Sequence, residues 1–369
     1  MTKSLCIAHG GDVSDPSGGT DRVSAIAGGL QDRGFDVALV VPEPASTLPD
    51  KLDNVSVHPV STDAPVGESV ARAASVARTA KRVANQRGAR LQLEHSTFSG
   101  IATLLGISDF VLDMHDLGYA RYDHVDTPFA PALKRGVHWL ERRAVSAASD
   151  IVVVSEYMRS ALANWQRGPS EVSVVPNGFF PERVASARDV STVDGRVCFL
   201  GTLHPKVDVG AFERVASLST VSELVIIGDG ALREQVDSLA EQHDSVRATG
   251  RLPDHEAFDL LASGAVAVNP QTQSELQRSS SPVKLYYYAA LGLPMVVAPG
   301  PTVVEELEEE DAAVTADGSE EVADAVDGLL SDDKRRTNVG VNARDASEAF
   351  RWARRVDMFE TIYRNTSEA

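Results

Sequence analysis

Short runs of β-branched and other apolar residues alternate with amphipathic stretches along almost the whole chain, and this alternation constrains the fold more than any other feature. When a helix separates two strands, it carries the chain back across the sheet, so the strands run parallel. The sequence therefore predicts an α/β protein with doubly wound parallel sheets. The predicted strands are Leu5–Ala8, Val37–Val41, Val55–Val60, Leu91–Glu94, Phe110–Met114, Ile151–Val154 and Val172–Val175, followed by Val197–Leu200, Leu224–Ile227, Val246–Ala248, Ala265–Val268 and Met295–Val297.

The alternation is interrupted once, by a polar stretch over residues 181–195, and then starts again. A chain of 369 residues is also long for a single core. We therefore expect a first domain of residues 1–180, a second of residues 181–348, and a final helix within residues 349–369. Parallel sheets bind ligands at the carboxyl ends of their strands, so the expected site is a cleft between the two domains. Amphipathic helices are expected at residues 21–33, 68–87, 156–165 and 351–364.

The chain is acidic, with a net charge of −18, and only seven of its 35 basic residues are lysine. This balance resembles that of haloarchaeal proteins, because concentrated salt screens the repulsion between surface carboxylates. An ordinary acidic bacterial enzyme is the alternative. In either case, an acidic surface disfavours non-specific binding of nucleic acid.

No run of about 18 apolar residues occurs, and the chain enters a predicted strand at Leu5. We therefore expect neither a membrane span nor a secretory leader, and we expect a cytoplasmic protein. The two cysteines, Cys6 and Cys198, fall in strands of different predicted domains. Buried free thiols are the interpretation that this separation favours.

The segment from Ser280 to Gly300, SSPVKLYYYAALGLPMVVAPG, has the most specific local pattern. Ser281 suits a helix N-cap, Pro282 suits the first helical position, and Gly292 is expected just past the helix end. Lys284 then falls in the first turn, where free backbone amides and the helix dipole favour an anion. The segment therefore predicts a diphosphate site.

Glycine-containing loops follow several of the predicted strands. Glycine lets backbone amides approach a phosphate, although a strand-to-helix turn also takes glycine for steric reasons alone. Neither half contains G-x-G-x-x-G in the corresponding place or a G-x-x-x-x-G-K-[ST] loop, which argues against a dinucleotide-dependent oxidoreductase and a P-loop NTPase. The loops are His9-Gly10-Gly11, Pro16–Thr20, Gly201-Thr202 and Gly228–Gly230.

In order and spacing, these motifs resemble the GT-B glycosyltransferases, especially glycosyltransferase family 4, the group 1 enzymes. The resemblance covers nearly the whole chain. It implies two Rossmann-like domains facing across a cleft, with the acceptor in the N-terminal domain, the donor in the C-terminal domain, and a C-terminal helix that returns to the N-terminal domain. The motifs are Ser17–Arg22, Arg33–Val37, Ser149–Glu156, Val174–Gly178, Phe199–Leu203, Ile226–Gly230 and the P-x-K-L-x-x-Y-x-A-x-G-x-P-x-V run from Pro282 to Val296.

Members of this family move a sugar from a nucleotide-activated donor to an acceptor hydroxyl, usually with retention of anomeric configuration. Lysines and a helix N-terminus suit a departing diphosphate without a metal, and we see neither a D-x-D motif nor a Cys/His cluster of ligand spacing. No cofactor and no metal are therefore expected. The resemblance implies donor diphosphate binding by Gly18, Gly19, Gly201, Thr202, Lys206 and Lys284, and nucleoside binding by Gly228, Arg251, Glu275, Ser281 and Tyr287.

Two positions depart from the family pattern. Thr202 stands where many members have an arginine, which removes one cation from the donor site. Tyr287 stands where a glutamate usually accepts hydrogen bonds from the ribose hydroxyls, and the upstream glutamate of the pair falls at Ser279, four residues after Glu275. Either ribose recognition is rebuilt with Tyr287 and Glu275, or donor binding is weak. Ordinary helix packing is the alternative interpretation of the Tyr286–Tyr288 run.

His115 follows the predicted strand Phe110–Met114 and is the catalytic candidate. The resemblance implies that it contacts the transferred sugar; a histidine that merely ends a strand beside Asp116 is the alternative. His9, after the first strand, and Asp116 are assigned to the acceptor or sugar side. Asp113 and Glu94 are further candidates for hydrogen bonds to acceptor hydroxyls, and a solvated surface explains either equally well.

A basic stretch with interleaved aromatic residues, FAPALKRGVHWLERR, occupies residues 129–143 of this acidic chain. It suits contact with an anionic lipid surface and hence a lipid-linked acceptor on the cytoplasmic membrane face. An amphipathic helix facing the core, with a solvated basic side, is the alternative.

The sequence thus predicts a glycosyltransferase that uses a nucleotide-sugar donor and a glycan or polyprenyl-lipid-linked acceptor in glycoconjugate synthesis. Two alternatives stay open, because Thr202 and Tyr287 weaken the donor site. One is a catalytically weakened partner that binds a sugar or nucleotide. The other is an epimerase of nucleotide sugars on the same fold.

Overall fold

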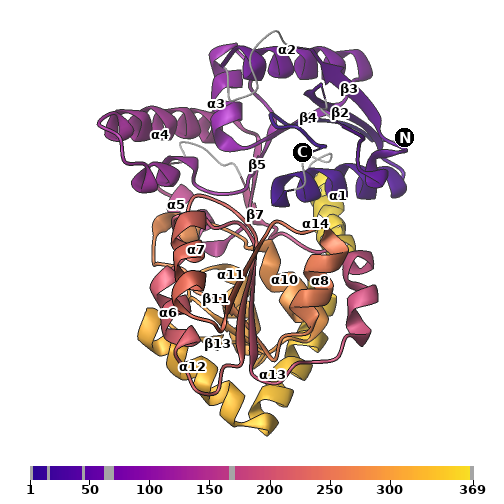
Figure 1. The fold of residues 1–369 in the computed structure, drawn as a ribbon. Helices are drawn as coiled ribbons and strands as arrows, with labels where there is room; N and C mark the ends of the chain where they lie inside the picture. Colours follow the sequence, from indigo (N-terminus) through magenta and orange to yellow (C-terminus); the bar gives the residue numbers. More distant parts are fainter. Residues whose placement is uncertain (1–2, 15–16, 44–45, 62–69, 166–170, 366–369) are drawn as a thin grey trace. The chain divides into compact units, whose positions relative to one another are not determined.

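The computed structural model describes the chain except for residues 1–2, 15–16, 44–45, 62–69, 166–170 and 366–369. It consists of two compact units (Figure 1). The N-terminal unit comprises Met1–Asn177, Ser279–Ser281 and Trp352–Ala369, and the C-terminal unit comprises Gly178–Arg278 and Pro282–Arg351. The sequence pattern put these divisions at residues 180 and 348 and gave no sign that residues 279–281 belong with the first unit.

A parallel sheet of seven strands forms the centre of the N-terminal unit, in the order β3-β2-β1-β4-β5-β6-β7. The chain moves outward in one direction from β1 to β3 and in the other from β4 to β7, as in a doubly wound sheet. Every side chain of β5 is buried, and so is all of β1 after its first residue, because helices cover both faces. The seven predicted strands are confirmed as β1 (Ser4–Ala8), β2 (Asp36–Pro42), β3 (Ser56–Val60), β4 (Arg90–Glu94), β5 (Val111–Met114), β6 (Asp150–Val153) and β7 (Glu171–Val174).

One helix of the N-terminal unit comes from the far end of the chain. Helix α14 (Trp352–Asn365) packs against α1 (Gly18–Asp32), and the α14 residues Val356 and Phe359 are buried in the core of this unit. This confirms the predicted return of the C-terminal helix. The other helices are α2 (Val70–Arg87), α3 (Ser96–Leu104), α4 (Ala130–Ala147) and α5 (Glu156–Leu162), with 3₁₀ turns η1 (Asp50–Leu52) and η2 (Gly118–His124); the first two residues of the predicted helix 68–87 lie outside the described residues.

The C-terminal unit contains a second parallel sheet, with six strands in the order β10-β9-β8-β11-β12-β13. A separate apolar cluster covers each face, one containing Leu285 and Val297 and the other Phe212 and Val296. The strands are β8 (Arg196–Leu200), β9 (Glu223–Ile227), β10 (Val246–Gly250), β11 (Val266–Asn269), β12 (Met295–Val297) and β13 (Val314–Thr315), the last of which was not predicted. The helices are α6 (Val209–Ala216), α7 (Arg233–Gln242), α8 (Asp254–Ala262), α9 (Glu275–Arg278), α10 (Val283–Leu291), α11 (Thr302–Glu309), α12 (Ser319–Ser331) and α13 (Asp333–Ala346), with 3₁₀ turns η3 (Pro181–Val184), η4 (Ser186–Asp189) and η5 (Ser347–Phe350).

Both cysteines are free and buried, as predicted, Cys6 on β1 and Cys198 on β8. Burial raises the pKa of each thiol to about 12, so neither forms a reactive thiolate near neutral pH. Among the described residues, no helix combines the length and the apolar character needed to cross a bilayer.

Candidate functional site

The helix predicted after Ser281 is present, but its N-cap differs from the prediction. Helix α10 begins at Val283, and its N-cap is Pro282 without a side-chain hydrogen bond. Ser281, predicted as the cap and as a nucleoside-binding residue, uses its hydroxyl to accept the amide hydrogen of Asn177 at 3.0 Å. Its carbonyl accepts a second bond from the Asn177 side chain at 2.9 Å. The predicted end of the helix is confirmed, because Gly292 takes the left-handed conformation with φ 69°.

Lys284 lies in the first turn of α10, and its ammonium is held close to the end of β8. Its Nζ lies 4.1 Å from the centre of the Phe199 ring. A Cβ atom on Gly201 would lie 2.6 Å from that nitrogen, so only glycine leaves room for the ammonium. Gly201 also has φ 137°, a conformation that other residues rarely adopt. The lysine and the glycine therefore form one packed unit at the carboxyl end of the sheet.

Lys284 has no carboxylate partner among the residues that the structure describes. Among the described residues, none forms an ion pair with its ammonium, which packs on the aromatic ring instead. Burial, with a smaller contribution from the charge of Lys206, lowers the pKa of Lys284 to about 7. Two lysines therefore stand close to each other at a helix N-terminus, which is an arrangement that a bound anion stabilises.

The loop that carries Lys206 is fixed by its backbone. The carbonyl of Lys206 accepts the amide hydrogen of Thr272 at 2.8 Å, and Val207 pairs with Gln271 in an antiparallel bridge. Two residues further on, Asp208 caps helix α6 by accepting from Ala211 at 3.2 Å. Lys206 is thus presented from an anchored turn, unlike a lysine on a free surface loop.

The glycines at the ends of β8 and β9 pack backbone against backbone. A Cβ atom on Gly228 would lie 2.0 Å from the carbonyl oxygen of Gly201, and the amide of Gly228 donates to Gly250 at 2.9 Å. Steric need therefore explains Gly228 without a ligand. Thr202 is exposed beside Gly201, and its carbonyl accepts the amide hydrogen of His204 at 2.9 Å.

The remaining nucleoside candidates differ in their surroundings. Tyr287 is 4% exposed, its ring packs on Phe258 at 4.7 Å between centres, and its hydroxyl accepts from Arg183 at 3.3 Å. Tyr286 and Tyr288 are buried as well, so packing explains all three tyrosines. Arg251 is exposed after β10, and the partly exposed Glu275 begins the short helix α9.

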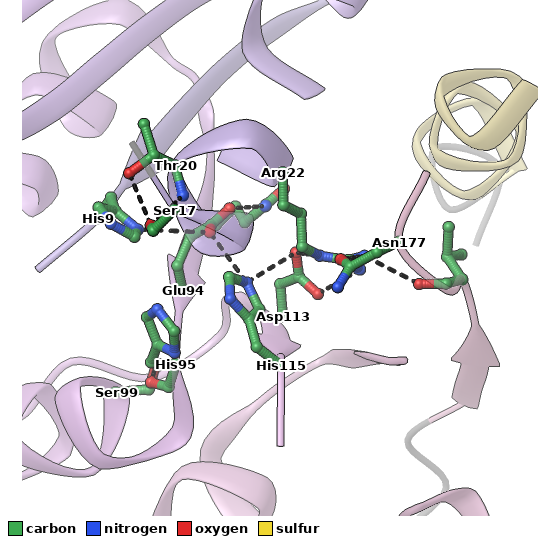
Figure 2. A network of polar contacts seen from close by, with 12 residues as sticks. His9, Ser17, Thr20, Arg22, Glu94, His95, Ser99, Asp113, His115 and Asn177 are labelled. Carbon is green, nitrogen blue, oxygen red and sulfur yellow. Dashed lines mark hydrogen bonds and ion pairs between the residues drawn. The ribbon is translucent and has the colours of Figure 1, made fainter. Parts of the chain in front are cut away.

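In the N-terminal unit, the ends of β1, β4 and β5 bring four polar side chains together (Figure 2). His115 Nε2 lies 3.1 Å from a carboxylate oxygen of Glu94 and 3.6 Å from one of Asp113. His9 Nδ1 lies 3.6 Å from the same oxygen of Glu94. Both carboxylates are fully buried and His115 is nearly so. His115, His9, Glu94 and Asp113, all considered from the sequence, therefore belong to one network.

Arg22, from the second turn of α1, balances one of these two carboxylates. Its guanidinium donates to both oxygens of Asp113 at 2.8 Å, and it also donates to the Asn177 side chain at 3.2 Å. Glu94 needs a second cation because it is buried beside this pair. His115 supplies it, as the only titratable group in contact with both carboxylates among the described residues.

The pKa values agree with this charge balance. Burial alone would lower the pKa of His115, but the hydrogen bonds to Asp113 and Glu94 and their charges raise it to about 9. Burial would raise the pKa of Glu94, but the two histidines hold it below its ordinary value. His95 has a lowered pKa because of burial and the neighbouring charges of His115 and His9. At neutral pH the network therefore contains an imidazolium at His115 and a neutral imidazole at His95.

The predicted glycine loop lies beside these rings. Helix α1 begins at Gly18, and Ser17 caps it by accepting the amide hydrogen of Thr20 at 3.1 Å. A Cβ atom on Gly19 would lie 3.7 Å from His115 Nδ1 and 3.8 Å from His95 Nε2. Asp116 points into an ion pair with Arg121 at 2.6 Å. The N-terminus of α1 therefore lies next to the rings of His115 and His95, whereas the carboxylate of Asp116 pairs with Arg121.

The same network contains the residues best suited to a metal ion. One ligand atom from each of Glu94, Asp113 and His115 lies within 4.8 Å of the others. Arg22, however, already donates to both oxygens of Asp113, and its guanidinium would repel a divalent cation so close by. The arrangement favours an imidazolium at this position over a metal ion.

Sequence reasoning missed three residues of this unit. Arg22 and Asn177 are buried network members, and Glu141 on α4 accepts from Ser96 at 2.5 Å and from the Gly118 amide at 2.8 Å. Burial raises the pKa of Glu141 to about 7. For Arg22 the sequence did contain a sign, because this arginine directly precedes the largely apolar helical stretch Val23–Leu30.

Comparisons with known proteins agree with the geometry. Residues 17–178 match the family model described as "Glycosyl transferase 4-like domain", and residues 194–332 match "Glycosyl transferases group 1". Alpha-maltose-1-phosphate synthase from Mycolicibacterium smegmatis is 27% identical over 62% of this chain, and the matched region spans 66% of that enzyme's length.

Two solved structures have the same fold over almost the whole chain. A sucrose-phosphate synthase from Thermosynechococcus elongatus superposes with a TM-score of 0.81 at 17% identity, covering 99% of both chains. HepE from Anabaena in complex with UDP superposes with a TM-score of 0.71 at 16% identity, covering 99% of this chain and 100% of the other.

Proposed function

Because the chain belongs to the group 1 glycosyltransferases, we propose that it transfers a sugar from a nucleotide-sugar donor to an acceptor hydroxyl. The observation that carries this proposal is the ammonium of Lys284, which is largely buried at the N-terminus of α10 with no carboxylate partner among the described residues. A buried charge of this kind is costly unless a ligand balances it. The donor diphosphate supplies that balance.

The chemistry of sugar transfer suits these groups. As the bond between the anomeric carbon and the diphosphate breaks, negative charge accumulates on the departing oxygen. Lys284, the nearby Lys206 and the amides of the first turn of α10 would stabilise that charge more strongly than the charge of the intact donor. Bound diphosphate would in turn raise the pKa of Lys284, so the lysine is a full cation when the bond breaks.

Uridine is the base to test first, because the Anabaena HepE structures were solved with UDP and with UDP-glucose. We infer that the usual carboxylate contact to the ribose is absent, since Tyr287 packs in the core with its hydroxyl bonded to Arg183. Retention of configuration is proposed from the family alone. No residue of this chain is assigned as a nucleophile.

The acceptor is assigned to the N-terminal unit, where His115 lies near the N-terminus of α1. We propose that this imidazolium donates a hydrogen bond through Nδ1 to an oxygen of the bound sugar. Glu94 and Asp113 are the residues that keep it protonated and oriented. A glycan or a polyprenyl-linked saccharide is the proposed acceptor, in glycoconjugate synthesis at the surface of a membrane.

Two observations favour a second candidate function. The burial of Tyr287, together with Thr202 in place of the usual arginine, reduces the contacts available to a nucleotide. A sugar- or nucleotide-binding partner without transfer activity would have this property. It would bind UDP-sugars but leave them intact when acceptors are added, and an epimerase would instead isomerise the donor.

Calorimetric titration with UDP and UDP-glucose tests the donor site. Lys284→Met should weaken binding by about 10- to 100-fold, since a charged hydrogen bond contributes about 1.5–3 kcal/mol. Lys334→Met changes the charge equally at an exposed position on α13 and serves as the matched control. If the wild-type protein binds neither UDP and UDP-glucose nor any other nucleoside diphosphate or nucleotide sugar, the proposed function is wrong. Equal binding by Lys284→Met and wild type would remove the lysine from the site.

A further inference from the structure

The outer face of helix α4 carries arginine and large apolar side chains together. Burial on this helix is confined to Ala130, Glu141, Ala144 and Val145. At about 100° per residue these four lie on one side, and Arg135, Trp139, Arg142 and Arg143 fall on the other. Glu141, the helix's sole acidic residue, is fully buried, so no carboxylate of α4 reaches that outer face.

Three large apolar side chains of α4 and its N-cap are exposed. Phe129 at the N-cap is 73% exposed, Trp139 is 53% exposed and Leu133 is 47% exposed. Leu104, at the end of the neighbouring helix α3, is 52% exposed. The helix does bury one side and leave a basic side exposed, as the alternative interpretation of this stretch expected, but Phe129 and Trp139 are exposed as well. We call Phe129, Arg135, Trp139, Arg142 and Arg143 the α4 face; Figure 1 labels helix α4, which carries it.

The arginines of the α4 face stand together without carboxylate partners among the described residues. Some surface arginines elsewhere form ion pairs, as Arg33 does with Asp357 and Arg196 with Glu223, and others, such as Arg78 and Arg214, also form none there. Among the described residues, Arg135, Arg142 and Arg143 pair with none. The guanidinium of Arg143 instead lies over the Trp139 ring at 5.1 Å and donates to Thr103 at 3.2 Å. Lys134, beside this face, is the basic residue of the helix that does have an acidic partner, Asp123.

We propose that the α4 face docks on the surface of a bilayer containing anionic lipids, with Trp139 and Phe129 inserted among the headgroups. Guanidinium groups that have no carboxylate partner among the described residues match lipid phosphates, and exposed aromatic rings match the boundary between headgroups and acyl chains. A protein of net charge −18 is repelled by an anionic bilayer elsewhere on its surface, so this face fixes its orientation. This docking rests on the proposed function, in which the acceptor is linked to a lipid, because an enzyme held at the membrane reaches an acceptor that is confined there.

Tryptophan fluorescence gives a direct readout. Of the three tryptophans, Trp165 and Trp352 are buried at 8% and 3% exposure, so Trp139 dominates any response to a new environment. Full-length protein is mixed with vesicles of phosphatidylcholine containing 30 mol% phosphatidylglycerol, chosen as the probe lipid, over a range of salt concentrations. We expect a blue shift and co-flotation that weaken as salt rises, and neither effect with pure phosphatidylcholine.

Substitutions separate the contribution of the arginines to vesicle binding from that of Trp139. Arg135→Ala with Arg142→Ala should lower partitioning onto anionic vesicles about 30-fold, from about 5-fold for each arginine. Trp139→Phe should abolish the blue shift while retaining flotation. Arg247→Ala with Arg335→Ala removes the same charge from exposed positions of the C-terminal unit and should leave both readouts unchanged. UDP titration of every variant tests the donor site of the C-terminal unit independently of vesicle binding, so failure of one proposal does not conceal failure of the other.

Absence of vesicle binding at low salt would overturn the proposal. So would equal binding by the double-arginine variant, or binding to neutral vesicles as strong as to anionic ones. Sedimentation of the free protein tests the competing occupant, a second copy of the chain. If the wild-type protein is a dimer and Trp139→Ser is a monomer, the α4 face is an interface between two copies of the chain instead.

Discussion

Replacing Lys284 with methionine should stabilise the free protein while removing its donor site. The side chain of methionine fills a similar volume against the Phe199 ring and has no charge to be removed from water. Most substitutions at a binding site either destabilise or have no effect. A gain in stability at this position would therefore be specific to a strained, unpaired cation.

The size of the gain follows from the pKa of Lys284. Between the ordinary value of 10.5 and the folded value of about 7, the unfolded chain binds a proton that the folded chain does not. At about 1.4 kcal/mol per pH unit, this interval corresponds to at most about 5 kcal/mol. Because the residue retains partial contact with water, we expect about 2 kcal/mol.

The pH dependence has a definite sign. Below pH 7 both states are protonated, and the folded state bears the full cost of the charge. As the pH rises from about 7 to 10.5, wild-type stability increases relative to Lys284→Met, and the difference between them disappears above that window. Other groups titrate equally in both proteins and cancel in this comparison.

Cysteine labelling measures the stability of the C-terminal unit by itself. Cys198 is fully buried on β8, so its native-state reaction with a thiol reagent reports opening of that unit, in a background where Cys6 is replaced by alanine. The rates are measured at pH 6, 7.5 and 9 and divided by those of the unfolded chain. Slower opening of Lys284→Met at pH 6 supports the reasoning. Faster opening at pH 6 would mean that Lys284 is favourably paired and would refute it.

Three further predictions concern other parts of the two sites. Glu94→Gln removes one of the carboxylates that raise the pKa of His115 to about 9, so NMR titration should find that pKa lower; an unchanged value would exclude the role given to Glu94. Gly201→Ala should destabilise the C-terminal unit by about 1–3 kcal/mol and weaken UDP binding, since its Cβ would meet the lysine ammonium; Gly318→Ala, with φ 84° and open space, controls for backbone strain alone. Arg22→Met leaves two buried carboxylates, Asp113 and Glu94, to share the charge of His115. It should cost about 3–5 kcal/mol by denaturant unfolding, and a loss below 1 kcal/mol would contradict the charge balance.

The sheet architecture could be predicted because buried parallel strands are continuous apolar runs. β12 shows this most clearly, since Met295–Val297 was predicted with the bounds observed. β13 was missed because Val314–Thr315 is too short to form a pattern. The strand–helix order, rather than any one motif, therefore determined the fold class.

Side-chain partners were harder to predict, because they come from distant parts of the chain. Serine is a preferred residue at a helix N-cap, yet the hydroxyl of Ser281 accepts a hydrogen bond from the amide of Asn177, 104 residues away in the sequence. Arg22 pairs with a carboxylate 91 residues away, and no local pattern indicates that pairing. The helix that carries Lys284 and its end at Gly292 were predicted from sequence, because both are local features. The role of Lys284 in binding an anion stays a prediction.

The position of helix α14 also limits the order in which the protein can fold during synthesis. Its Tyr363 donates to Gln92, and Gln92 donates to Glu94 at 2.8 Å, so this helix supports the histidine network from behind. The N-terminal unit is made first by the ribosome, but its core lacks Val356 and Phe359 until residues 352–365 have been synthesised. The C-terminal unit, nearly continuous in sequence, is therefore the first that can close, and the earlier half of the chain must wait for the later one.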